Sequence, residues 1–513
     1  MLLRLLAAFL PFLLLATTWS EAETLSSPGT NSSDPKIVSA PNKSLVAAWI
    51  EEGLVKAKTR PAGGAWGASE TLSGSGASSL QLAVDGVGNA FAIWVESESV
   101  KTRILPLGGA WGSATALSGA NSSSPQIAAN SAGDAAAVWV EGGAVQSKTR
   151  LAMGDWQPMA DTLAVSGATP HIAVGGTTVA AVWSQVDAAM SKIYANQKSV
   201  SGSWGEAGAI SESRYKCAYP KIAVDRYGNL LAAWYRYIFQ GGVYSSVVMQ
   251  SAFQASGCSW GEPDDVSGTG IRNPADLTID LDFNYGGLGL ATWTNSSDGS
   301  LFTVDGSVRG SNGWIGVTAF QPADIFAYSM SLSVEPYGLA ALVYMDHDEE
   351  DGKCILQSRF ANTYSAFQNV SPPEPLPVQN DAGYPSAALA FGSGSWQIGA
   401  VWLEYDGMFA AVRSSIGNRP NSIPPVQSAS VAQSAENCGL FIEYANTVSW
   451  TNTSGYTAQG VNLFRNGQPI ISLPVSVTSY IDHNQKQNGP VTYGIAYFSI
   501  DGNQGPITTV SLP

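Results

Sequence analysis

The chain has 513 residues, 13% of them charged, and a formal net charge of −15. Nucleic acids and anionic membrane surfaces are disfavoured as partners, because they carry the same sign of charge as the protein. Apolar residues come in short β-branched or alanine-rich runs bounded by Gly, Asn and Ser, and helical periodicity is nearly absent. This composition predicts an all-β protein with no nucleic-acid partner.

The N-terminus has the pattern of an export signal. Arg4 precedes a short apolar run that ends near Ala16 and is too short to cross a membrane comfortably. No later run approaches the ~20 apolar residues that a spanning helix needs. We therefore predict a signal peptide over residues 1–18 and a secreted or cell-surface protein without a membrane span. Export permits disulfides, but the pairing of Cys217, Cys258, Cys354 and Cys438 stays open.

A short motif with a central aromatic recurs along most of the chain. It reads Ala-Val-Trp-Val-Glu in its clearest copy, at 137–141. The eight aromatics are Trp49, Trp94, Trp139, Trp183, Trp234, Trp293, Tyr344 and Trp402. A repeat of 40 to 60 residues without helical signals is typical of a β-propeller, whose blades are four-stranded antiparallel sheets. We predict an eight-bladed propeller over residues 19–418.

The third repeat shows the expected blade in full. Its strands are predicted at 125–129, 135–140, 144–151 and 156–163, separated by Gly- and Asp-containing turns. The distance from the start of the first strand to the aromatic hardly varies among repeats. The length of the repeat varies after the aromatic, in the connection between the second and third strands. The longer loops should therefore lie on one face of the disc, where functional loops are usually found.

The last repeat lacks its outer strand, and the N-terminus supplies a match. Residues 19–26 agree with residues 66–73 at five of eight positions. We predict that the N-terminal segment adds the outer strand of the last blade and closes the ring, which removes exposed sheet edges.

Two sets of tryptophans recur, one on the second strand and one near the fourth. We expect both sets to be core residues that pack between blades, the fourth-strand set against the next blade, because aromatics dominate such cores. The rival interpretation is a ring of sugar-stacking platforms.

After a linker at 419–425 the pattern changes. Residues 426–513 contain about seven short strands with turn signals, which indicates an immunoglobulin-like sandwich. Trp450, the Tyr480-x-Asp482 corner and the strand from Tyr493 to Tyr497 resemble a fibronectin type III domain. That resemblance implies a spacer or a protein-binding module and no catalysis.

The repeats themselves resemble sialidase-like and lectin-type propellers. The resemblance is architectural, since the Ser-x-Asp-x-Gly-x-x-Trp box of sialidases is absent, as are an arginine triad and a Tyr/Glu pair. Only three histidines occur, and no nucleophile elbow, phosphate loop or His-Glu-x-x-His motif is found. The chain has forty carboxylates, and the sequence alone does not bring two of them together.

Two local clusters are candidate sites. Asp346, Asp348 and Glu350 lie in the densest acidic run, which predicts either a calcium site or a solvated acidic loop, and no other cofactor. The fifth repeat combines aromatic and arginine side chains, a composition typical of recognition surfaces. Its residues are Arg214, Tyr215, Tyr219, Tyr235, Arg236, Tyr237, Phe239 and Tyr244. The alternative is that half of them pack under the long loop.

These features favour a non-catalytic binding protein that holds a glycan or an extracellular protein on the long-loop face. One alternative is a glycoside hydrolase or lyase whose carboxylates line the axial face of the propeller. Another is a structural surface scaffold. The ligand and the oligomeric state are not specified by the sequence.

Overall fold

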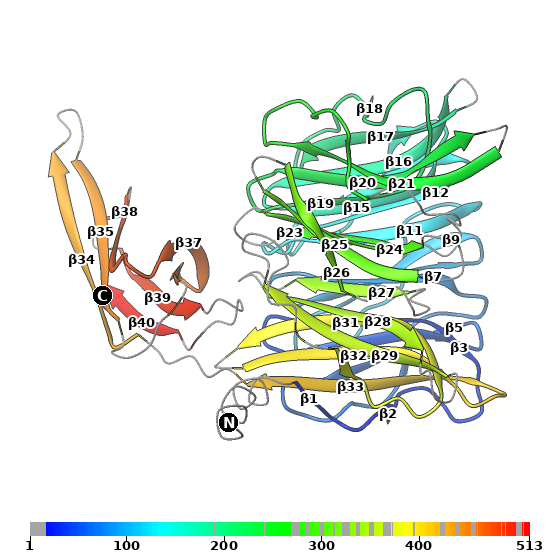
Figure 1. The fold of residues 1–513 in the computed structure, drawn as a ribbon, viewed down its shortest axis with the longest axis horizontal. Helices are drawn as coiled ribbons and strands as arrows, with labels where there is room; N and C mark the ends of the chain where they lie inside the picture. The colour runs from blue at the N-terminus through cyan, green and yellow to red at the C-terminus, as the bar shows by residue number, and fades with distance from the viewer. Residues whose placement is uncertain are drawn as a thin grey trace, which may run out of the picture.

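The computed structural model describes residues 17–512. It leaves out 188–189, 241–242, 268–277, 284–287, 297–301, 311–312, 321–328, 335–338, 348–352, 363–370, 372, 393–394, 421–425, 438–441, 453–457, 459, 484, 488, 499–504 and 506. The described part is all-β, and its four-stranded antiparallel sheets follow one another along the chain as a β-propeller (Figure 1).

The sheets are numbered here in chain order. Sheet 1 is β3 (Ser32–Ser39), β4 (Leu45–Glu51), β5 (Leu54–Arg60) and β6 (Glu70–Thr71); sheet 2 is β7 (Ser78–Val84), β8 (Ala90–Glu96), β9 (Ser99–Leu105) and β10 (Thr115–Ala116). Sheet 3 is β11 (Ser122–Ala129), β12 (Ala135–Glu141), β13 (Ala144–Arg150) and β14 (Asp161–Ala164); sheet 4 is β15 (Ala168–Gly175), β16 (Thr178–Asp187), β17 (Met190–Ser199) and β18 (Gly208–Ala209). Sheet 5 is β19 (Lys216–Val224), β20 (Leu230–Gln240), β21 (Val243–Gln254) and β22 (Asp264–Asp265); sheet 6 is β23 (Ile279–Phe283), β24 (Gly289–Ser296), β25 (Phe302–Gly310) and β26 (Gly313–Ala319). Sheet 7 is β27 (Met330–Val334), β28 (Leu339–His347), β29 (Cys354–Asn362) and β30 (Glu374–Pro375).

Sheet 8 joins the two ends of the propeller sequence. It contains β31 (Asp381–Gly392), β32 (Ser395–Tyr405) and β33 (Ala410–Pro420), and both β1 (Thr18–Trp19) and β2 (Glu23–Thr24) pair with β33. The N-terminal segment therefore lies where its match to residues 66–73 places it. The first strands of sheets 1 to 8 contact one another in order, and β31 also contacts β3, so these strands form a closed circle.

The repeated aromatics are the core, as predicted. The seven tryptophans and Tyr344 on the second strands are fully buried between neighbouring sheets. The second set of tryptophans is half-buried, and here the predicted direction is wrong. Trp66 of sheet 1 donates to Ser414 of sheet 8 (3.1 Å), and Trp314 of sheet 6 donates to Ser251 of sheet 5 (2.7 Å). In both pairs the accepting serine lies on the third strand of the preceding sheet.

The glutamate two residues after the aromatic anchors the connection between sheets. The Glu96 Oε2 atom accepts hydrogen bonds from the Trp94 indole (3.0 Å) and from the backbone N–H of Gly74 (3.0 Å), which lies in the connection from sheet 1 to sheet 2. In the same way, the Glu51 Oε2 atom accepts hydrogen bonds from the Trp49 indole (3.0 Å) and from the backbone N–H of Ser27 (2.9 Å). The motif thus combines core packing with a carboxylate that holds the incoming chain.

Residues after β33 form a second unit with its own core. One sheet contains β34 (Ser428–Asn437), β35 (Ile442–Thr451) and β38 (Ser479–Asp482). The other contains β36 (Gly460–Arg465), β37 (Gln468–Pro474), β39 (Val491–Phe498) and β40 (Thr508–Leu512). Trp450 and Tyr493 are buried between them, and the Tyr493 hydroxyl donates to Asp482 (2.6 Å).

Two further findings concern helices and cysteines. In the described part of the chain, no helix is long and apolar enough to cross a membrane. Cys217, Cys258 and Cys354 are free thiols, whereas Cys438 lies outside the described residues.

The carboxylate anchor can be tested at Glu96. Glu96→Ala should destabilise the protein by about 1–3 kcal/mol, because it leaves the buried Trp94 indole and the Gly74 N–H without their acceptor. Burial acts to raise the pKa of this carboxyl, but hydrogen bonds from Lys101, Trp94 and Gly74 outweigh it and hold the pKa below its usual 4.5. The carboxylate therefore stabilises the fold above pH 4.5, and this contribution is lost as the pH falls through the lower folded pKa.

The measurement is denaturant unfolding at neutral and acidic pH, with Glu70→Ala at an exposed site as the control. An equal loss for both variants at neutral pH would contradict the anchor.

Candidate functional site

One residue from each first strand faces the centre of the circle. Each occupies the same register, paired with the residue just before the buried aromatic. The eight residues, which we call the axial ring, are Lys36, Gln81, Gln126, His171, Lys221, Asp280, Ser331 and Ser386. All eight are polar and half-buried. Lys36 and Lys221 stand on opposite sides of the circle and still interact electrostatically, so both side chains project toward the axis.

Backbone hydrogen bonding explains why the ring is polar. A first strand has a partner on one side only, so the N–H groups of its free edge need acceptors. Ser386 accepts from the Ile37 N–H (3.2 Å) and Ser331 from the Ala387 N–H (3.1 Å). Asp280 Oδ2 accepts from Leu332 (3.0 Å) in the same way. The ring therefore has a structural role that uncharged residues fulfil.

The titratable members of the axial ring lie on sheets 4 to 6 and on sheet 1 opposite them. They are His171, Lys221, Asp280 and Lys36. Asp282 adds a further carboxylate two residues along β23, and alternate residues of a strand project to the same side. The equivalent positions in the other sheets hold Val38, Ala83, Ala128, Ala173, Ala223, Ser333 and Ala388. Asp282 is thus the one charged residue at this level of the circle.

Burial shifts the protonation of this cluster. It raises the pKa of Asp282 to about 7, and the charge of Asp280 adds to the effect. Burial also raises the pKa of Asp280, against the opposing charge of Lys221. The pKa of Lys221 is lowered by burial, and that of Lys36 by burial and by the charge of Lys221. Burial and the charge of Lys221 hold the pKa of His171 well below its usual value.

One carboxyl of this cluster has a pKa near neutrality. Asp282 titrates near neutrality, which is the property that a general acid or base needs. Asp280 and Asp282 are two residues apart on one strand, which separates their Cα atoms by about 6–7 Å. Within the described residues the Lys221 ammonium makes no ion pair or hydrogen bond, and its charge interacts with that of Asp280. No group of three or more potential metal ligands occurs in the described part of the chain.

The predicted surface residues of sheet 5 separate into an exposed and an interior group. Arg214 and Arg236 both lie over the ring of Tyr215, at 4.8 and 4.4 Å from its centroid. Tyr219 and Phe239 are exposed. Tyr235 is not a surface residue, because its ring is 1% exposed and its hydroxyl donates to the Thr278 carbonyl (3.0 Å).

The remaining predicted residues are placed only in part. Lys216 lies over the ring of Tyr237, and the side chain of Tyr244 lies outside the described residues. Asp346 is buried at the end of β28, whereas Asp348 and Glu350 lie outside the described residues. The calcium site and the sheet 5 surface therefore stay predictions.

The axial cluster was missed by the sequence analysis, although the sequence contains a signal for it. Five ring residues directly follow a proline within the first strand, as in Pro35-Lys36, Pro170-His171 and Pro220-Lys221. Reading that position across the repeats gives a polar residue each time.

Comparisons with known proteins give distant structural likenesses only. No protein-family model and no curated protein matches the chain. Among solved structures, polysaccharide lyase Uly1 aligns with a TM-score of 0.42 and 8% identity over 75% of this chain and 89% of its own. Hadza microbial sialidase Hz136 aligns with a TM-score of 0.31 and 12% identity over 71% and 73%. The Penicillium chrysogenum alpha-L-arabinanase aligns with a TM-score of 0.32 and 14% identity over 62% and 92%.

These names correct one expectation. These three structures are named as enzymes, which contradicts the prediction of a non-catalytic binding protein and agrees better with the alternative of a glycoside hydrolase or lyase. At these TM-scores and identities, the likeness concerns the propeller fold and assigns no residue a role.

The protonation of Asp282 can be measured through stability. Its pKa rises from 3.8 to about 7 on folding, so the native state binds a proton more tightly than the unfolded chain, and stability falls as the pH rises through that interval. Asp282→Asn removes this loss. We expect the variant to be more stable than the parent above pH 7 and to gain nothing near pH 4.

Thermal unfolding across this pH range checks the prediction, with the exposed Asp155→Asn as the control. A gain for Asp282→Asn that does not change with pH would contradict the raised pKa.

Proposed function

We propose that the chain is an exported carbohydrate-active enzyme, a glycoside hydrolase or lyase. Its catalytic groups would lie at the axis of an eight-bladed propeller. The observation that carries the proposal is the convergence of Asp280 and Lys221 of the axial ring with Asp282, two residues along β23, whose carboxyl has a pKa of about 7. The fibronectin type III-like unit, residues 426–513, would act as a spacer or a second contact.

Hydrolysis of a glycosidic bond needs an acid on the leaving oxygen and a second carboxylate for the water or the sugar. Asp282 would be protonated over much of the neutral range and would donate its proton to the glycosidic oxygen. Asp280 has a lower tendency to be protonated because Lys221 opposes the effect of burial. It would serve as the carboxylate that activates water or stabilises positive charge on the sugar ring.

A lyase is the second candidate, and the state of Lys221 favours it. A lysine with a lowered pKa can abstract a proton next to a carboxylate group of the substrate. Asp282 would then protonate the leaving oxygen, and a carbon–carbon double bond would form in the sugar. The two reactions differ in their products, since hydrolysis consumes water and elimination does not.

The test incubates the protein with a panel of neutral and uronate-containing polysaccharides. Reducing ends report both reactions, and ultraviolet absorbance of an unsaturated sugar reports only the lyase. Asp282→Asn should lower the rate by about 10²–10⁴-fold, as expected for loss of a general acid. Asp280→Asn should also lose activity, while its amide oxygen can still accept from Leu332.

The repeats offer a matched control. Gln126→Asn changes the axial ring in sheet 3, where no charged residue is present at that position. It should leave activity within about twofold. Unchanged activity in both aspartate variants would overturn the site assignment, and no product from any glycan would overturn the proposed function.

A further inference from the structure

An acid, a base and a tryptophan recur together where one sheet of the propeller meets the next, at the rim. The acid lies on the outer strand of one sheet, and the base lies on the third strand of the following sheet, paired with the residue four positions before the buried aromatic. The tryptophan follows that third strand. The three sets are Glu23, Arg60 and Trp66 between sheets 8 and 1, Asp161, Lys198 and Trp204 between sheets 3 and 4, and Asp264, Arg309 and Trp314 between sheets 5 and 6.

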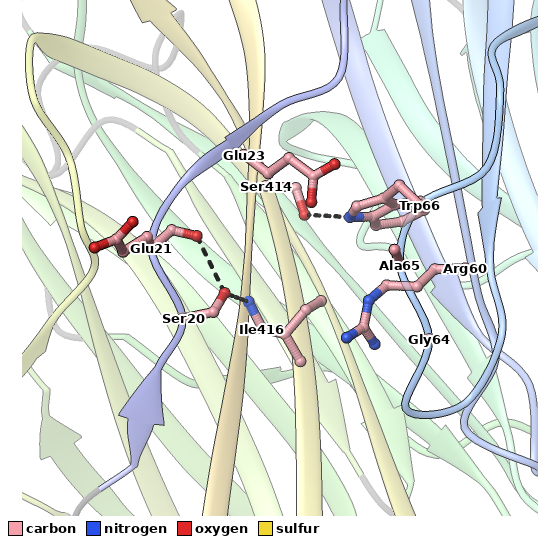
Figure 2. Close-up of a pocket in the computed structure, with 9 residues that line it drawn as sticks. All are labelled: Ser20, Glu21, Glu23, Arg60, Gly64, Ala65, Trp66, Ser414 and Ile416. Atoms are coloured by element: carbon pink, nitrogen blue, oxygen red, sulfur yellow. Dashed lines mark hydrogen bonds between the residues drawn. The ribbon is translucent and has the colours of Figure 1, made fainter.

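The set between sheets 8 and 1 lines a cavity of about 330 Å³, and we call it the rim site (Figure 2). Glu23 comes from β2 of sheet 8, whereas Arg60 ends β5 of sheet 1. The Trp66 indole donates to Ser414 of β33 (3.1 Å), which fixes the ring against sheet 8. Figure 2 shows the Glu23 carboxylate and the Arg60 guanidinium on the lining of this cavity, with the indole beside them.

The two charged side chains of the rim site have no partner of their own. Among the described residues, neither the Arg60 guanidinium nor the Glu23 carboxylate makes a hydrogen bond or an ion pair. The Nη1 atom of Arg60 is buried without an acceptor. Because a buried donor without an acceptor is costly, the cavity favours a molecule that supplies one.

The other two sets show the structural role that these positions can have. Between sheets 3 and 4, Lys198 makes an ion pair with Asp161 (3.5 Å) and donates to Thr149 (2.9 Å). The same ammonium lies 5.3 Å from the centroid of the Trp204 ring. Between sheets 5 and 6 the charge of Asp264 acts on Arg309. Acid and base can therefore join neighbouring sheets at this register, and the rim site lacks such a pair.

We propose that the rim site binds one neutral sugar unit of a polysaccharide. A sugar hydroxyl both donates and accepts, so the hydroxyls of one sugar ring accept from Arg60 and donate to Glu23. The apolar C–H face of the sugar packs on the Trp66 ring, since ligand sites combine an apolar wall with a few placed polar groups. Glu21 also lines the cavity and adds a second negative charge, which disfavours uronate and sulfated units.

The rim site is separate from the axial ring. An outer strand lies three strand spacings, or about 14 Å, from the first strand of its own sheet. A polysaccharide held at the rim is thus anchored away from the carboxylates of the axis, and the site supplies binding without chemistry. The inference goes beyond the proposed function and does not depend on the reaction at the axis.

The test uses the protein with Asp282→Asn, to slow any turnover, on a microarray of neutral and uronate-containing polysaccharides. An oligosaccharide of the neutral polysaccharide that binds best is then titrated calorimetrically. Glu23→Gln and Arg60→Gln should each weaken binding at the rim by about 10-fold or more, because each removes a charge-assisted hydrogen bond. The double variant should bind one ligand fewer per chain.

Glu70→Gln is the matched control. Glu70 occupies the position of Glu23 on the outer strand of sheet 1, but the following sheet has Leu105 where sheet 1 has Arg60. An exposed change without a partner should leave the affinity within about twofold and the melting temperature unchanged. Melting temperatures of the other variants check that they are folded.

Three results would overturn the rim site: an unchanged number of bound ligands in the double variant, an equal loss with Glu70→Gln, or a parent that binds no neutral polysaccharide. Binding is measured without product formation, so the outcome is distinct from that of the enzymatic proposal. A protein that binds at the rim and releases no product from any glycan would overturn the proposed function alone.

Discussion

The hydrogen bond from a buried indole to the glutamate two residues later organises much of this propeller. One carboxylate satisfies the tryptophan that fills the space between sheets and the backbone of the connection that enters the glutamate's own sheet, as Glu96 does for Trp94 and Gly74. Buried donors are costly when unpaired, so the motif couples core packing to the path of the chain. Gln185 takes the indole contact in sheet 4, and Gln250 takes it from the third strand in sheet 5.

A ring built from such units still needs closure. Each sheet contacts only its neighbours, and an unpaired last sheet would expose the edge of β33. The N-terminal segment covers that edge with two very short strands, which pair at Thr18 and Glu23. Short pairing alone gives few backbone hydrogen bonds, so contacts at the ends of the segment matter. Thr17 with Glu374 and Trp19 over Gly417 supply them.

The fold could be predicted because its signals are local and repeated, whereas the axial cluster could not. The period, the aromatic and the match of residues 19–26 to 66–73 are visible in one chain. Lys36 and Lys221 interact electrostatically only because the circle is closed, and no local sequence pattern specifies that closure. The composition of sheet 5 also led to a wrong prediction for Tyr235, because neighbouring residues of a strand face opposite sides of the sheet. Tyr235 is therefore buried while Arg236 reaches Asp265.

The same repetition separates structural polarity from chemistry at the axis. Every first strand needs polar side chains there to accept hydrogen bonds from the N–H groups at the unpaired edge of the neighbouring strand. Serine does this as well as aspartate, so Asp280 has a structural role that does not require a carboxylate. Asp282 is different. Six of the seven equivalent positions hold alanine or valine, so most sheets have no polar group at this level, and the seventh, Ser333, accepts from the Leu389 N–H (2.9 Å). A carboxyl there is destabilising when ionised, as its raised pKa indicates, and the sheet gains only a local bond to Phe283. Asp282 therefore lowers the stability of the fold when ionised and contributes little to it structurally, which is what we would expect of a residue used for proton transfer.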